Sequence, residues 1–145
     1  MSRLSPALAL VLLIAAGPAA AASTPPPANP TVLMSPVGLP VVVDGRLVNY
    51  VFVTLRLGLS GSADAPKMRA MEPYFRDALV RAAHRTPFVR DDNYAALDDV
   101  RLKAVLIREA NAVAGPGSVV SVQILREQPQ HFDGLPKPKT GPRSR

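Results

Sequence analysis

The stretch LPVVVDGRLVNYVFVTLRLGL, residues 39–59, decides the fold. A short apolar run ends at Val43, the pair Asp44-Gly45 follows, and a longer run rich in Val, Leu, Tyr and Phe extends to Leu59. Asp-Gly between two apolar runs is typical of a tight hairpin turn, because both residues tolerate a positive φ. The stretch therefore predicts two antiparallel strands joined at Asp44-Gly45.

Successive side chains of the second strand point to opposite faces of the sheet, so the sequence shows which residues share each face. One face is apolar except at Asn49, and we expect it to form core; the other is mixed, and we expect it to be half-covered. The expected core face comprises Leu47, Val51, Val53, Leu55, Leu57 and Leu59. The mixed face comprises Val48, Tyr50, Phe52, Thr54 and Arg56.

Two helical patterns follow the hairpin. Residues 67–84 repeat apolar side chains every three or four positions, and Pro73 inside them indicates a first turn that ends near Glu72 and a main helix that starts at the proline. The second helix begins at Asp98, which is a good N-cap, and ends at Gly115.

Residues 118–127 return to the alternation of a strand. The order β-β-α-α-β predicts an α+β domain. We expect a small antiparallel-type sheet, made of the hairpin and the C-terminal strand, with two helices packed on one face.

The two ends of this domain are rich in proline. Residues 23–35 contain the run TPPPANP and are expected to form an extended linker. Residues 129–145 carry four prolines and few apolar side chains, so we expect a disordered tail. Residues 36–128 remain as a single domain, which is long enough to fold around one core without cysteines.

The N-terminus, residues 1–22, has the pattern of an export signal. Arg3 precedes an uncharged apolar run, and small residues favour cleavage after Ala22. The alternative is a retained membrane anchor, which needs about 20 consecutive apolar residues and would count the alanines beyond Gly17-Pro18. Both interpretations predict export, to the periplasm as a free domain or to the outer surface of the inner membrane as an anchored one.

The net charge of +6 belongs mainly to the ends of the chain. Residues 36–128 contain twelve Lys or Arg and ten Asp or Glu, and twelve minus ten leaves +2. The basic tail could contact an anionic membrane surface or act only as a solubilising end. Composition and compartment together argue against nucleic-acid binding.

Few residues are suited to catalysis or metal binding. His84 and His131 are not at ligand spacing, and no nucleophile motif or phosphate-binding glycine loop is present. The pairs Asp91-Asp92 and Asp98-Asp99 fit neither an EF-hand nor a catalytic carboxylate pair. We therefore expect no enzyme activity, no cofactor, no metal and no small-molecule substrate.

Four segments between Val48 and about Gln128 together resemble the periplasmic domain of the flagellar basal-body-associated FliL family. They are NYVFVTLRL (residues 49–57), EPYFRDAL (72–79), RLKAVLIREANAV (101–113) and SVVSVQI (118–124). The resemblance implies a stomatin-like α+β fold that oligomerises around the stator units of the flagellar motor and supports motility without catalysis. The chain departs from the family in its short segment before the apolar run and in its basic C-terminal extension.

Three functional hypotheses follow. The leading one is a non-enzymatic periplasmic accessory protein of the flagellar basal body that binds itself or the stator. The alternative is a generic periplasmic binding or envelope-scaffold domain unrelated to motility. The third is an envelope hydrolase that uses Asp91, Asp92 or His84. The side chains expected to contact a protein partner are Tyr50, Phe52, Arg76 and Arg81.

Overall fold

The computed structural model describes residues 29–138 and is built around one long strand, β3 (Arg46–Leu59). β2 (Val37–Val43) precedes it, and the two strands form a hairpin. Both turn residues have a positive φ, 51° at Asp44 and 73° at Gly45, which explains why Asp-Gly occupies the turn. The predicted hairpin is confirmed.

Antiparallel partners lie along both edges of β3. β4 (Val119–Pro129) pairs with residues 51–59 along one edge. The other edge is shared by β2 and by β1 (Thr31–Leu33), which pairs with residues 56–58. Between these two partners the Met34 amide donates to the Leu55 carbonyl oxygen at 2.9 Å. β1 and β2 therefore form one interrupted edge strand.

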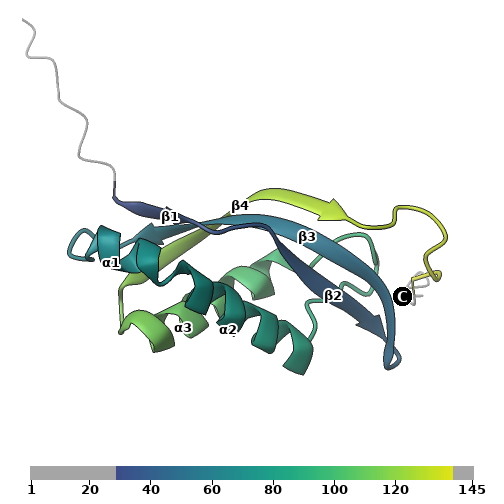
Figure 1. Ribbon diagram of the computed structural model, residues 1–145. Coiled ribbons are helices and arrows are strands. Elements are labelled where there is room, and N and C mark those ends of the chain that lie inside the picture. Colours follow the sequence, from purple (N-terminus) through teal and green to yellow (C-terminus); the bar gives the residue numbers. More distant parts are fainter. Residues whose placement is uncertain (1–28, 139–145) are drawn as a thin grey trace, which may run out of the picture.

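Three helices lie on one face of this sheet: α1 (Ala65–Ala70), α2 (Glu72–Arg85) and α3 (Asp99–Ala114) (Figure 1). α2 packs on β2, and α3 packs on α2 and β4. The α+β class, with a small antiparallel sheet and helices packed on one face, is confirmed. The order is β-β-β-α-α-α-β, so the sequence prediction missed one short strand and one short helix.

The helix ends follow from local chemistry. The Asp98 carboxylate accepts from the Arg101 amide at 3.0 Å and caps α3, and Gly115 ends that helix with a φ of 108°. The Asp64 carboxylate caps α1 in the same way through the Lys67 amide. α1 stops before Met71, and the adjacent α2 carries Pro73 in its first turn, where a missing N–H costs least.

The core lies between the helices and the face of β3 that the alternation identifies. Five of the six expected core side chains are buried there: Val51, Val53, Leu55, Leu57 and Leu59. The prediction was wrong for Leu47, which is 52% exposed. Val41 pairs with Asn49 but Val42 pairs with Leu47, so Val48 is an extra residue that shifts the alternation.

The predicted domain boundaries at Pro36 and Gln128 were too narrow. Within the expected linker, β1 forms, and Val32 and Met34 are completely buried in the core. Pro129, which we expected to open a disordered tail, is buried at the end of β4. The adjacent Gln130 amide donates to the Tyr50 carbonyl oxygen at 2.7 Å. Both segments are ordered because β3 offers them backbone partners and a core to cover.

The predicted signal segment, residues 1–22, and its cleavage site at Ala22 lie outside the described residues, as do positions 23–28 and 139–145. Within residues 29–138, none of the helices has the length and apolar character that a bilayer span requires.

Candidate functional site

The sheet face turned away from the helices carries no helix in the described part of the chain (Figure 1). We call it the open face. β3 contributes Tyr50, Phe52, Thr54 and Arg56 to its centre. The pairing of the strands places these neighbours beside them: Leu33, Gly38 and Pro40 on one side, and Gln123, Arg126 and Gln128 on the other.

Two aromatic side chains form the apolar part of the open face. Phe52 is 45% exposed, and its ring lies against Gly38, where a Cβ would come within 3.0 Å of the ring carbon Cε1. Tyr50 is half-buried and stands directly opposite the buried Pro40 on the neighbouring strand. Because Gly38 has no side chain, the Phe52 ring can pack directly against β2.

The rest of the open face is polar or basic. Arg56 and Arg126 are exposed, and none of the strand residues assigned to this face is acidic. Leu33, beside Arg56, is 61% exposed. The face thus combines exposed apolar side chains with arginines, a composition that favours contact with another protein.

Asn49 fixes the end of β3 that carries the aromatic pair. It is 3% exposed in an otherwise apolar face, and every hydrogen-bonding group of its amide is used. Its Nδ2 donates to the carbonyl oxygens of Tyr94 (3.2 Å) and His131 (3.0 Å). Its Oδ1 accepts from the amides of Tyr50 (2.9 Å) and His131 (3.1 Å). One side chain therefore ties the loop before α3 and the segment after β4 to the strand.

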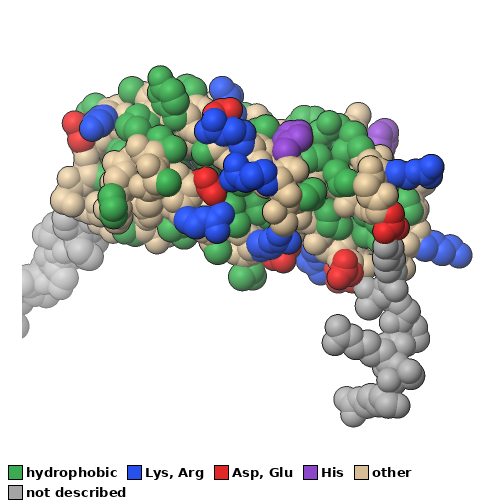
Figure 2. Space-filling view, turned by 90° about the horizontal axis from the view of Figure 1, so that it is seen from below, with side chains coloured by type: hydrophobic (Ala, Val, Ile, Leu, Met, Phe, Trp, Pro, Cys, Tyr) green, Lys and Arg blue, Asp and Glu red, His purple; other side chains and the backbone are tan. Residues whose placement is uncertain are grey.

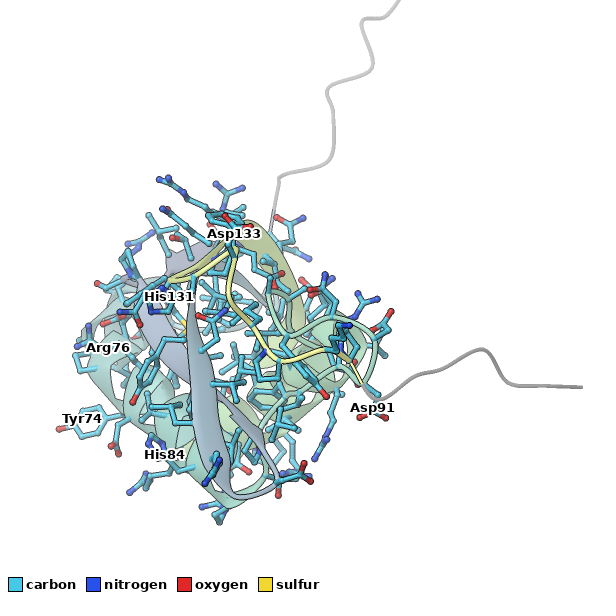
Figure 3. All side chains as sticks on the ribbon, turned by 90° about the vertical axis from the view of Figure 1, so that its right-hand side faces the viewer. Tyr74, Arg76, His84, Asp91, His131 and Asp133 are labelled. Atoms are coloured by element: carbon cyan, nitrogen blue, oxygen red, sulfur yellow. The ribbon has the colours of Figure 1, made fainter. Side chains whose placement is uncertain are left out.

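The other two expected contact residues belong to the opposite layer. Arg76 is half-buried on α2, and Arg81 is exposed on the same helix, where it pairs with Asp77 at 2.9 Å. Figure 3 shows Arg76 and Tyr74 on the side of the molecule formed by α2. The structure brings Tyr50 and Phe52 together on the open face but does not bring Arg76 and Arg81 to it.

The three residues considered for hydrolysis are not assembled into a site. His84 Nδ1 lies 2.8 Å from the Val80 carbonyl oxygen on its own helix. Asp92 accepts two hydrogen bonds from the Arg90 guanidinium, at 2.9 and 2.8 Å, and these hold the pKa of Asp92 below its ordinary value. Figure 3 shows His84 and Asp91 on opposite sides of the molecule. An acid-base pair needs both groups within reach of one substrate.

The region around Asp98 and Asp99 serves to hold the loop before α3. Asp98 is the cap of α3, and the Leu97 amide donates to Glu127 Oε1 at 2.7 Å. Burial raises the pKa of Glu127, the hydrogen bond from Leu97 opposes that rise, and the nearby Asp99 adds to it. Among residues 29–138, no group of three His, Cys, Asp or Glu side chains could hold a metal ion.

The sequence interpretation missed a second surface, between α2 and α3. A cavity of about 180 Å³ there is lined by three arginines, Arg85, Arg101 and Arg108. The spacing of seven residues between Arg101 and Arg108 is a signal in the sequence, since it places both on one side of a helix. Nothing in the sequence shows that Arg85 faces them from the other helix.

Comparison with models of known protein families found no match, and comparison with curated proteins found none. The resemblance to the FliL family therefore stays a prediction that rests on the four segments quoted above.

Proposed function

We propose that this chain is a non-enzymatic accessory domain that acts outside the cytoplasm and binds a protein partner through its open face. The observation that carries the proposal is the Phe52 side chain, which is 45% exposed beside Tyr50 on a sheet face that none of the described helices covers. Aromatic and arginine side chains are enriched in protein interfaces, and a few such residues usually supply most of the binding energy.

An open antiparallel sheet face can also be an ordinary solvated surface, which would be mostly polar. The open face differs from such a solvated surface because it exposes two large apolar side chains, Leu33 and Phe52. The rigid strand behind them supports the same interpretation. Asn49 and the pairing of β3 on both edges hold the aromatic pair in place, so binding would cost little conformational entropy.

The resemblance to the FliL family supplies the specific version of this proposal. Tyr50 and Phe52 lie within the segment NYVFVTLRL, which is part of that resemblance. On this basis the partner is a component of the flagellar basal body, the stator or a second copy of the chain, and the role is support of motility. The alternative is a periplasmic scaffold domain that uses the same face for another envelope protein.

Site-specific photo-cross-linking in cells tests the use of the open face. A benzophenone amino acid replaces Phe52 in the full chain, and the matched control carries it at Tyr74, an exposed aromatic residue on α2. We expect a light-dependent cross-linked product from position 52 that is absent from position 74. Equal cross-linking at the two positions, or none at position 52, would contradict binding through the open face.

The identity of the cross-linked protein separates the two versions. A stator or basal-body protein, or the chain itself together with a motility defect, supports the flagellar role. Another envelope protein supports the scaffold alternative. A deletion strain that swims and swarms normally under viscous load would rule out the flagellar role while leaving the use of the open face intact.

A further inference from the structure

The cavity between α2 and α3 lies in the helix layer, on the far side of the sheet from the open face. We call it the arginine groove. Figure 2 looks onto this layer and shows Lys and Arg side chains gathered across its middle. The groove has a volume of about 180 Å³. Its lining residues are Ala82, Arg85, Thr86, Phe88, Arg101, Val105 and Arg108.

The elements place charged side chains around an apolar floor. Phe88 is 1% exposed and Ala82 is 6% exposed, so the base of the groove is continuous with the core. Arg85 lies in the last turn of α2 and reaches the groove from one side. Arg101 and Arg108 lie two turns apart on α3 and reach it from the other.

One carboxylate partly offsets these three guanidinium groups. Glu109 Oε1 accepts from Arg108 at 2.9 Å and lies 3.5 Å from Arg85, which is long for a hydrogen bond. Arg101 has no ion pair with any of residues 29–138. Three positive charges and one negative charge leave a net charge of +2 in the groove.

The nearby acidic residues lie at a separate depression. Asp98 and Asp99, at the start of α3, line that depression together with Asp91 and Asp92. None of these four residues lines the arginine groove. The positive charge of the groove is therefore local and is not cancelled by acidic residues in its wall.

We propose that the arginine groove binds a phosphate group, as a small phosphate ester or as the headgroup of an anionic phospholipid. The planar guanidinium fork matches phosphate oxygens, and three arginines that line one cavity can share the several oxygens of one tetrahedral anion. The volume suits a single such group. Glu109 holds Arg108 in place, while Arg101 is left to pair with the ligand.

Titration with inorganic phosphate tests the site directly. The probe is added to the ¹⁵N-labelled chain, purified in the form in which cells process it, and amide chemical shifts are followed by NMR. We expect shifts confined to residues 82–88 and 101–109. Arg101→Gln should weaken phosphate binding about fivefold, which is the upper end of what one exposed charge pair contributes.

Two further variants control this result. Arg81→Gln removes the same charge one turn earlier on α2, outside the groove, and should leave phosphate affinity within about twofold of wild type. Arg85→Gln removes a groove arginine from the other helix and should also weaken phosphate binding. This variant keeps the proposal testable if the Arg101→Gln chain does not fold. Equal affinities of Arg101→Gln, Arg85→Gln and Arg81→Gln would overturn the proposal.

Vesicles separate the two sources of the phosphate. Cosedimentation is measured with phosphatidylcholine alone and with phosphatidylcholine mixed with phosphatidylglycerol. Binding only to the mixed vesicles, lost in Arg101→Gln but not in Arg81→Gln, identifies the headgroup of an anionic lipid. Phosphate binding without vesicle binding identifies a small ester. Amide chemical-shift changes spread over all the basic residues, and unaffected by Arg101→Gln, would mean that the groove is not a phosphate site.

Discussion

Asn49 shows how one buried polar residue can join three segments. It occupies a position that the alternation of β3 assigns to the core, and its four hydrogen bonds explain why an amide is tolerated there. The bonds reach the loop at Tyr94 and the chain after β4 at His131. Loss of this side chain should therefore loosen both segments.

We predict that Asn49→Leu lowers the free energy of unfolding by about 1–3 kcal/mol, because backbone groups of Tyr50, Tyr94 and His131 lose their buried partner. Urea denaturation measures the change. Gln123→Leu is the control, since it makes a similar polar-to-apolar change on the exposed open face and should shift stability by about 0.5 kcal/mol at most. Equal stabilities of the two variants would show that the Asn49 bonds contribute nothing.

Glu127 gives a prediction about pH. Its pKa is raised mainly by burial, so the folded chain holds the proton at pH values where the unfolded chain has lost it. The stabilising contribution is therefore complete below the ordinary pKa of Glu and is lost as pH rises through the raised value. Glu127→Gln keeps an oxygen for the Leu97 amide and removes the half-buried charge.

We expect Glu127→Gln to be more stable than wild type near neutral pH, and this advantage should shrink as the pH falls towards the ordinary pKa of Glu. Urea denaturation at about pH 4 and about pH 7 measures the difference, and only the comparison between the two proteins is used because other carboxylates titrate over the same range. Parallel pH profiles of the two proteins would contradict a raised pKa at Glu127.

Individual elements differ in how far the sequence alone could predict them. β3, α2 and α3 were predictable because their periodicities are long and local. β1 was not, because three residues carry no clear period and form a strand only where β2 leaves the edge of β3 free. The same difference applies to the two candidate surfaces. The sequence predicts that Tyr50 and Phe52 share a face, because residues alternate along a strand. It does not predict that Arg85 lies opposite α3, because that depends on how the two helices pack.

Two neighbouring substitutions test how much the segment before Pro36 contributes to stability. Met34→Ala should lower the free energy of unfolding by about 2–5 kcal/mol, because Met34 is completely buried. Leu33→Ala is the matched control. The Leu33 side chain is 61% exposed, so its truncation should lower the free energy of unfolding by about 0.5 kcal/mol or less. Similar losses in both variants would mean that the segment before Pro36 is not part of the core.

The two proposed sites lie on opposite layers of one domain and share no residue. Binding at the arginine groove therefore needs no movement of the open face. A phosphate-bearing membrane surface under the helices would leave Phe52 directed away from that surface, towards a protein partner. This arrangement predicts that Arg101→Gln leaves cross-linking at position 52 between purified copies of the chain unchanged.

Hydrogen exchange tests whether the sheet opens as one unit. β3 is paired on both edges, so we expect its amides between residues 51 and 57 to exchange only through global unfolding. The amides of Met34 and Gln130 should also be protected, because they bond to carbonyl oxygens of β3 at 2.9 and 2.7 Å. Native-state exchange followed by NMR provides the rates. If the amides of Met34 and Gln130 exchange as fast as in an unfolded chain while β3 stays protected, the ordered domain ends at the boundaries predicted from the sequence. The hydrogen bonds between Asn49 and the segment after β4 would then be transient.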